Sequence, residues 1–200
     1  MLYTPWGYSV EANEVPPIIT PEQLHDATGG RFGPHTQGVD AVLAGVGAAI
    51  RNACGWHVSP SLPVVERTQG PGRIIALRTM LMTGLTEVVE NGEALPSGCC
   101  EWTEGGLLRR CQFRQWPCGL GSVVVRYTSG IPAECAPDLV TVAAQIAANA
   151  LAAPAGVRSE QAGDVSITYN QTGAGVSGGV RLLDSDLMML APYMLQGVLS

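Results

Sequence analysis

Two stretches of the chain repeat apolar side chains at intervals of three and four residues, the spacing of one buried face of an α-helix. The first covers residues 37–54 and ends before Gly55, a residue type that suits the left-handed position terminating many helices. The second covers residues 137–153, opens with Pro137-Asp138 and is rich in alanine. Pro154 ends it, because proline cannot continue a helix. The pattern predicts two long amphipathic helices.

Two short helices are indicated by their capping residues. In Thr20-Pro21-Glu22 a hydroxyl cap precedes a proline at the first helical position and an acidic residue, which predicts a helix over residues 22–27. Asp184 predicts the cap of a last helix over residues 185–191, ended by Pro192.

Between the long helices the apolar period changes from about 3.6 to two. Residues 122–128 alternate like a half-buried strand, and Asn91-Gly92 is a strong hairpin turn signal. Strands at 100–103 and 107–111 flank Glu104-Gly105-Gly106, and strands at 64–69 and 73–78 flank Gly70-Pro71-Gly72, which predicts two further hairpins. The predicted fold class is α+β: a small helical core of two long helices plus short ones, with an antiparallel β insertion between the long helices.

The expected domain organisation has three parts. Residues 1–36 form an extended N-terminal arm with a short helix, residues 37–192 form the main domain with its β-rich insertion at about 58–129, and residues 193–200 form a C-terminal tail. Arm and tail carry large apolar side chains that either fold back on the chain or are buried in a neighbouring protein. These interface candidates are Tyr3, Trp6, Tyr8, Tyr193, Met194, Leu195, Val198 and Leu199.

The composition adds an indication of assembly. Charged residues make up 14% of the chain, against about a quarter in typical soluble domains. Because interface cores are depleted in charge, partner subunits covering part of the surface would explain this; a loop-rich monomer with a Gly, Ser and Thr surface is the alternative. The net charge of -6 argues against a nucleic-acid-binding surface, which needs clustered Lys and Arg. This net charge does not exclude a central channel through which DNA passes without specific contacts.

The sequence carries no clear targeting or metal-binding signal. No apolar run approaches the roughly 18 residues of a membrane span, and the first residues lack the basic start and apolar run of a signal peptide. We therefore expect no membrane partner and synthesis in the cytoplasm. The six cysteines lack zinc-site spacing, which predicts no metal. Because the chain lacks secretory marks, the cysteines are expected to be free thiols.

The sequence motifs do not predict catalysis. There is no Walker loop, and the glycine-rich stretch 173–179, which matches the pattern G-x-S-x-G at residues 175–179, is interpreted as a flexible loop. We therefore expect no catalytic, cofactor-binding or metal residues, no cofactor, and no enzyme activity. The competing hypothesis is a small thiol enzyme using Cys54 or Cys118 with one of the three histidines. Trp56, just after the first long helix, is expected to fill the junction between helix and sheet.

The order of several segments resembles that of a known family. Residues 50–60 end the first long helix, residues 125–130 close the β insertion, Pro137-Asp138-Leu139 opens the second long helix, and residues 156–169 and 184–193 follow. In this order the chain, from about Val39 to Tyr193, resembles the head-to-tail adaptor proteins of siphophages, the gp6-like head-tail connector family.

The resemblance implies a structural protein of the virion neck. Its members form a ring, expected to be a dodecamer, between the portal protein and a stopper or tail-terminator protein, with DNA passing through the centre. It implies portal docking by the segment after about Leu187, and no catalytic residues. A stopper or tail-terminator subunit is the alternative; those proteins are usually dominated by strands, whereas here two long helices carry the clearest periodicity.

Overall fold

The computed structural model describes residues 1–12, 14–70, 72–111, 114–152, 159–162, 165–168 and 180–195. The chain divides into two compact units, and it passes from one to the other several times. Unit 1 combines Met1–Pro16, Cys54–Cys135 and the segment from Pro192 onward. Unit 2 combines Pro17–Ala53 with Ala136–Ala191. Both units are therefore built from segments that are distant in the sequence.

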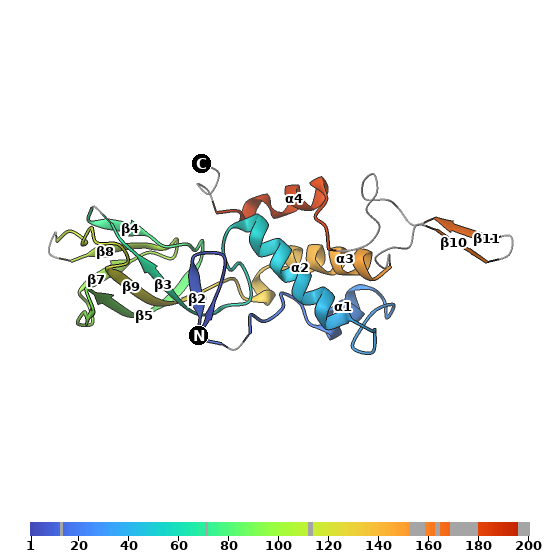
Figure 1. Cartoon of the computed structure of the whole chain (residues 1–200), viewed down its shortest axis with the longest axis horizontal. Coiled ribbons are helices and arrows are strands. Elements are labelled where there is room, and N and C mark those ends of the chain that lie inside the picture. Colours follow the sequence, from blue (N-terminus) through green and yellow to red (C-terminus); the bar gives the residue numbers. More distant parts are fainter. Residues whose placement is uncertain are drawn as a thin grey trace. The chain divides into compact units, whose positions relative to one another are not determined.

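Unit 2 is the helical part of the fold. Its helices are α1 (Pro21–Ala27), α2 (Val39–Cys54, whose last residue belongs to unit 1), α3 (Pro137–Ala152) and α4 (Asp184–Leu190), and α3 packs against α1 and α4 (Figure 1). The two long helices bury their predicted apolar faces, and Gly55 ends α2 with a φ of 78°. Strands β10 (Ser159–Ala162) and β11 (Val165–Thr168) form a separate antiparallel pair between α3 and α4. The two predicted long helices are confirmed.

Local capping explains where the short helices start. The Thr20 hydroxyl accepts a hydrogen bond from the Gln23 backbone N–H at 3.2 Å, and the Thr20 N–H donates to Gln23 Oε1 at 2.8 Å. This reciprocal arrangement satisfies backbone donors that a helix start leaves unpaired. The predicted cap of α4 is wrong by one residue, because Leu183 is the N-cap and Asp184 is already helical. The Leu183 N–H donates to Asp186 Oδ2 at 2.9 Å.

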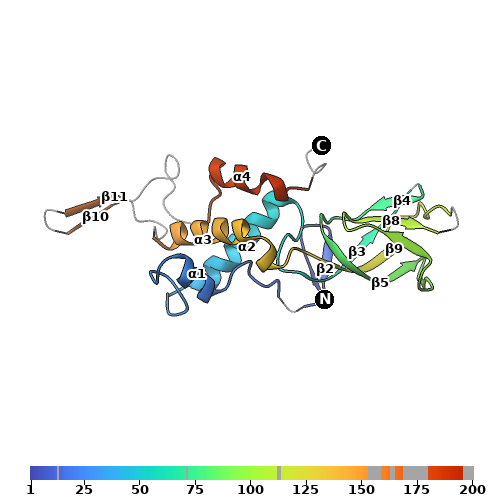
Figure 2. The same ribbon diagram turned by 180° about the vertical axis from the view of Figure 1, so that it is seen from behind.

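Unit 1 contains two antiparallel sheets (Figure 2). The larger sheet has the order β1-β2-β3-β9-β5-β6, and the smaller has the order β4-β8-β7. The strands are β1 (Leu2–Tyr3), β2 (Tyr8–Val10), β3 (Leu62–Thr68), β4 (Ile74–Ala76), β5 (Met82–Glu90), β6 (Glu93–Ala94), β7 (Cys100–Trp102), β8 (Leu107–Arg110) and β9 (Val123–Ser129). With the helices of unit 2, these antiparallel sheets confirm the predicted α+β fold class.

Two of the three predicted hairpins form. Asn91 and Gly92 join β5 to β6 with φ angles of 52° and 90°, the left-handed conformation that an Asn-Gly turn adopts. Strands β7 and β8 pair around the turn at 103–106. The hairpin predicted around Gly70-Pro71-Gly72 is wrong, because β3 pairs with β2 and β9 whereas β4 pairs with β8. The chain leaves one sheet and enters the other at this point.

The two sheets share one apolar core. The central strand β9 buries alternate side chains, and β3 and β4 contribute Val64 and Ile75 to the same cluster. Successive side chains of a strand point to opposite faces of the sheet, so a strand with one face against the core buries every second side chain. The cluster contains Trp6, Tyr8, Val10, Val64, Ile75, Leu77, Met82, Val88, Leu108, Trp116, Val123, Val125 and Tyr127.

Residues 56–59, in the segment between α2 and β3, are buried. The Trp56 side chain is 0% exposed, which confirms its predicted burial, and its indole N–H donates to the carbonyl of Tyr193 at 2.7 Å. The Leu195 N–H donates to the Cys54 carbonyl at 2.8 Å. The start of the C-terminal tail is thus bound to the end of α2 within unit 1.

Candidate interaction surfaces

The aromatic residues of the N-terminal arm divide into buried and exposed ones. Trp6 and Tyr8 are 8% and 4% exposed and belong to the core of unit 1, since β2 pairs with β3. Tyr3, on the edge strand β1, is 83% exposed. Of these three side chains, Tyr3 is therefore the one available to a partner in this structure.

The C-terminal tail is fixed at its beginning. Tyr193, Met194 and Leu195 are partly buried, and the carbonyl of Tyr193 and the N–H of Leu195 make the two hydrogen bonds to Trp56 and Cys54. Val198 and Leu199 lie outside the described residues. The tail thus starts from a fixed position beside the C-terminus of α2.

Helix α4 presents an apolar surface that the sequence patterns did not single out. Met188 is 78% exposed and Met189 is 47% exposed, while Leu190 on the opposite side is fully buried. We name the exposed residues Leu183, Met188 and Met189 the methionine patch. A signal was present in the sequence, because a seven-residue helix with Leu-Met-Met-Leu cannot bury every apolar side chain on one narrow face.

The solvent face of the larger sheet carries an ion-pair cluster. Arg126 on β9 pairs through Nη1 with Glu11 and through Nε with Glu87 on β5 at 2.8 Å. A shallow pocket of about 370 Å³ beside it is lined by residues of β1, β2, β3 and β9, including Tyr3 and Val124. Because all three charged groups are more than a third exposed, their pairing orders this face but contributes little stability.

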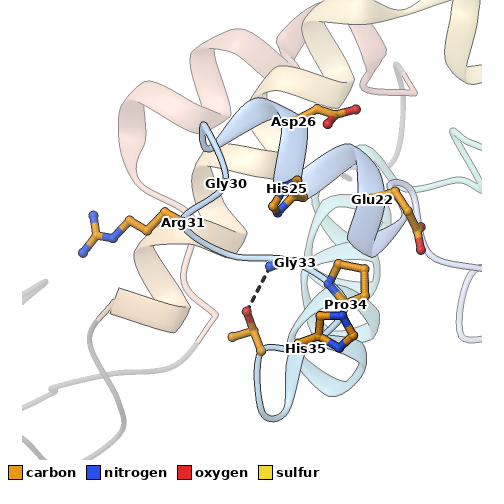
Figure 3. Close-up of a pocket in the computed structure, with 9 residues that line it drawn as sticks. Glu22, His25, Asp26, Gly30, Arg31, Gly33, Pro34 and His35 are labelled. Carbon is orange, nitrogen blue, oxygen red and sulfur yellow. Dashed lines mark hydrogen bonds between the residues drawn. The ribbon is translucent and has the colours of Figure 1, made fainter.

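A second pocket lies in unit 2, where the chain after α1 folds back over that helix (Figure 3). Its volume is about 580 Å³. The Thr28 hydroxyl accepts from the Phe32 N–H at 3.2 Å, and the Gly33 N–H donates to the Thr36 hydroxyl at 2.9 Å. The pocket is lined by Glu22, His25, Asp26, Gly30, Arg31, Gly33, Pro34, His35 and Thr36. These hydrogen bonds hold the loop without arranging a nucleophile beside a base.

The thiol chemistry disfavours the enzyme hypothesis for Cys54. Burial raises the pKa of the Cys54 thiol to about 12, so it is a poor nucleophile at neutral pH. The nearby His57 uses Nε2 in a 2.6 Å hydrogen bond to the carbonyl of Pro60. Cys118 is exposed, and neither of the two pockets described above includes it.

Metal ligands and long apolar helices are two further features to consider in the described part of the chain. Within it, no group of three or more His, Cys, Asp or Glu side chains is placed to hold a metal ion. Among the same residues, no helix combines the length and apolar character needed to cross a membrane.

A comparison with solved structures finds a similar fold. No protein-family model and no curated protein matches the chain. A chain from the structure described as the neck of an empty GTA (gene transfer agent) particle, computed with C6 symmetry, matches with a TM-score of 0.55 at 14% identity. The match covers 96% of this chain and 97% of that one. This chain therefore shares its fold with a chain from a particle neck.

Proposed function

We propose that this protein is a structural subunit of the neck of a tailed bacteriophage or a phage-like particle, and specifically a head-to-tail adaptor. The observation that carries the proposal is the fold match over nearly the full length of both chains. A match of that extent includes the helices, the β insertion and their order along the chain. The order of sequence segments that resembles the siphophage adaptors supports the same assignment independently.

The proposal includes self-assembly into a ring around the DNA channel. The neck with the similar fold was computed with sixfold symmetry, and a dodecamer is compatible with it because twelve is a multiple of six. The strand pair β10–β11 supports contact between copies, since neither strand pairs with any other described strand. An isolated two-stranded hairpin is only marginally stable in water, so a neighbouring subunit would complete it.

The partners would be the portal protein on one side and a stopper or tail-terminator protein on the other. For the portal we propose the methionine patch of α4 and the tail from Tyr193 onward, with Tyr3 on the sheet edge as a further candidate. Methionine adapts its shape to a partner surface, and large exposed apolar groups mark interaction sites. The protein would assemble in the host cytoplasm and reside in the virion neck.

The deciding experiment measures the mass of the purified protein by light scattering, alone and mixed with the portal protein of the same particle. We expect a monomer alone and a ring bound to the portal in the mixture, which electron microscopy would then image. A protein that stays monomeric in both samples contradicts the adaptor role. A protein that binds tail proteins but not the portal would be a stopper or tail-terminator subunit instead.

A further inference from the structure

The small sheet of unit 1 brings two cysteines to directly opposite positions. In the β7–β8 hairpin Cys100 is the partner of Arg110 and Glu101 is the partner of Arg109. Continuing this register by one residue places Cys99 opposite Cys111, and the Cys111 N–H donates to the Cys99 carbonyl at 3.0 Å. The two thiols therefore belong to one cross-strand pair at the open end of the hairpin.

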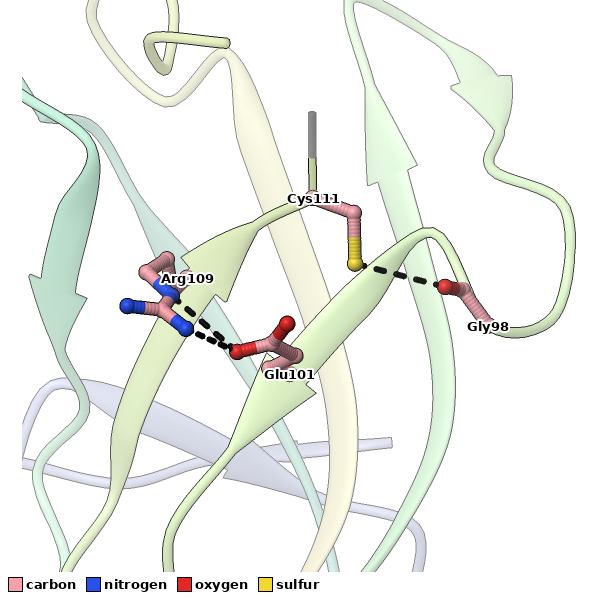
Figure 4. Close-up of polar contacts among 4 residues, drawn as sticks. All are labelled: Gly98, Glu101, Arg109 and Cys111. Carbon is pink, nitrogen blue, oxygen red and sulfur yellow. Dashed lines mark hydrogen bonds and ion pairs between the residues drawn. The ribbon is translucent and has the colours of Figure 1, made fainter. Parts of the chain in front are cut away.

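The spacing of such a pair suits a disulfide. Opposite residues in a hydrogen-bonded antiparallel pair have Cα atoms about 5.5 Å apart, and disulfides most often join Cα atoms about 5.5–6 Å apart. Side chains of opposite residues lie on the same face of a sheet. The next pair on this face, Glu101 and Arg109, meets in an ion pair (Figure 4). Side chains at these opposite positions therefore do come together.

The thiol of Cys111 already points toward the opposite strand. Its Sγ donates to the carbonyl of Gly98 at 3.4 Å, which is the residue before Cys99 (Figure 4). Cys99 and Cys111 are both partly exposed, so a small oxidant can reach them. Cys100 differs, because burial raises the pKa of its thiol to about 11 despite the nearby Arg110. Exposure and register therefore single out Cys99 and Cys111 among the thiols of this sheet.

We propose that Cys99 and Cys111 form a reversible oxidation site that closes the β7–β8 hairpin with a disulfide when a small-molecule disulfide such as oxidised glutathione is present. The thiolate of one cysteine attacks a glutathione sulfur, forming a mixed disulfide and releasing one glutathione thiolate. The second cysteine, as thiolate, attacks the protein sulfur of the mixed disulfide and releases the second glutathione. The pair loses two electrons and two protons, and oxidised glutathione gains both.

Closing this end of the hairpin has a structural consequence. The turn at the other end is bound to neighbouring segments, because the Met82 N–H donates to the Glu104 carbonyl at 2.7 Å and the Leu77 N–H donates to the Gly106 carbonyl at 2.8 Å. A disulfide between Cys99 and Cys111 would tie the open end as well. This inference goes beyond the proposed neck function and does not depend on it.

The experiment uses the full chain with the exposed Cys118 and Cys135 replaced by serine, oxidised with glutathione disulfide and digested with trypsin without reduction. Cleavage at arginine places Cys111 in the peptide 111–114 and Cys99 in the peptide 79–109. We expect these two peptides to be joined, to separate on reduction, and the oxidised protein to melt at a higher temperature than the reduced one.

Matched variants assign the bond. Because Cys99 and Cys100 share one tryptic peptide, Cys99→Ser should abolish the linked peptides whereas Cys100→Ser should retain them. Cys111→Ser should abolish them too. Linked peptides that persist in Cys99→Ser, or an oxidised protein without a joined pair, would overturn the proposal.

Discussion

Trp56 is the residue whose removal should cost the fold most. Its side chain is completely buried, and its indole N–H bonds the carbonyl of Tyr193. Truncation of a buried tryptophan to alanine typically costs about 3–5 kcal/mol. We expect Trp56→Ala to lower the free energy of unfolding by about that amount, measured by denaturant titration. Trp102→Ala is the matched control, because Trp102 is 38% exposed and should change stability far less.

Glu66 should make the stability of the protein depend on pH. Burial raises its pKa above 4.5, although the Arg78 N–H at 2.9 Å, the Tyr127 hydroxyl at 2.7 Å and the Arg78 charge oppose that rise. A raised pKa means that the folded state holds this proton more tightly than the unfolded state. The stability contributed by the protonated form is therefore complete below about pH 4.5 and is lost as the pH rises through the folded-state pKa.

Glu66→Gln removes that titration and keeps a side-chain oxygen as acceptor. We expect the variant to lose the part of the pH dependence that lies above pH 4.5, measured as melting temperature against pH. Glu101→Gln serves as control, because Glu101 is largely exposed in its ion pair with Arg109. An unchanged pH profile in Glu66→Gln would show that other groups set the pH dependence.

At the scale of elements, sequence patterns predicted what depends on neighbouring residues. The periodicity of α2 and α3, the Thr20 cap and the Asn91-Gly92 turn are all local, and each was confirmed. The strand that pairs with β3, by contrast, lies far from it in the sequence. Gly70-Pro71-Gly72 signals a change of direction, but pairing with β9 depends on a strand more than fifty residues later.

The candidate surfaces follow the same division. The sequence identified the aromatic residues of the arm as interface candidates from their residue type alone. It could not predict that Trp6 and Tyr8 are buried, because their burial depends on the pairing of β2 with β3. Exposure of Met188 and Met189 depends on which side of α4 faces α3, which the sequence of a seven-residue helix does not define.

The methionine patch gives a prediction for α4. Met188→Ser with Met189→Ser should leave the melting temperature of the isolated protein nearly unchanged, because both side chains are exposed. Binding to the portal should weaken, measured by surface-immobilised binding or co-sedimentation. Gln145→Ser with Asn149→Ser, on the exposed face of α3, is the matched control that should bind normally. Unweakened binding of the methionine variant would exclude the patch from portal docking.

The β10–β11 hairpin can be tested for a role between copies. Replacing residues 159–168 by a Gly-Ser linker should leave the fold of unit 1 intact and prevent ring formation with the portal, measured by light scattering. The chain contains no lysine, so Ser166→Lys adds a single side-chain amine. An amine-reactive cross-linker should then join copies in the ring but not in the monomer. Normal rings from the linker variant would refute the role.

At the scale of the whole molecule, the charged fraction is low, at 14% of the residues. All eleven residues of the Lys and Arg types are arginines. In the sheet unit Arg109, Arg110 and Arg126 form ion pairs, and that of Arg110 with Glu90 measures 2.7 Å. The low charged fraction led us to expect a surface partly covered by partner subunits, and ring formation in the light-scattering experiment described above would test that expectation. The sequence alone did not reveal that arm, insertion and tail contribute to one unit, because that requires segments distant along the chain to meet.

The position of β9 has a consequence for how the protein is made. Strands β3 and β5 do not pair with each other, and each pairs with β9, which is the last strand of the sheet in chain order. While the ribosome is still producing residues before Val123, the emerging chain holds two groups of strands of this sheet, β1-β2-β3 and β5-β6, without the strand that pairs with both. Their exposed edges must be protected until β9 leaves the exit tunnel, so synthesis of this sheet depends on its final strand.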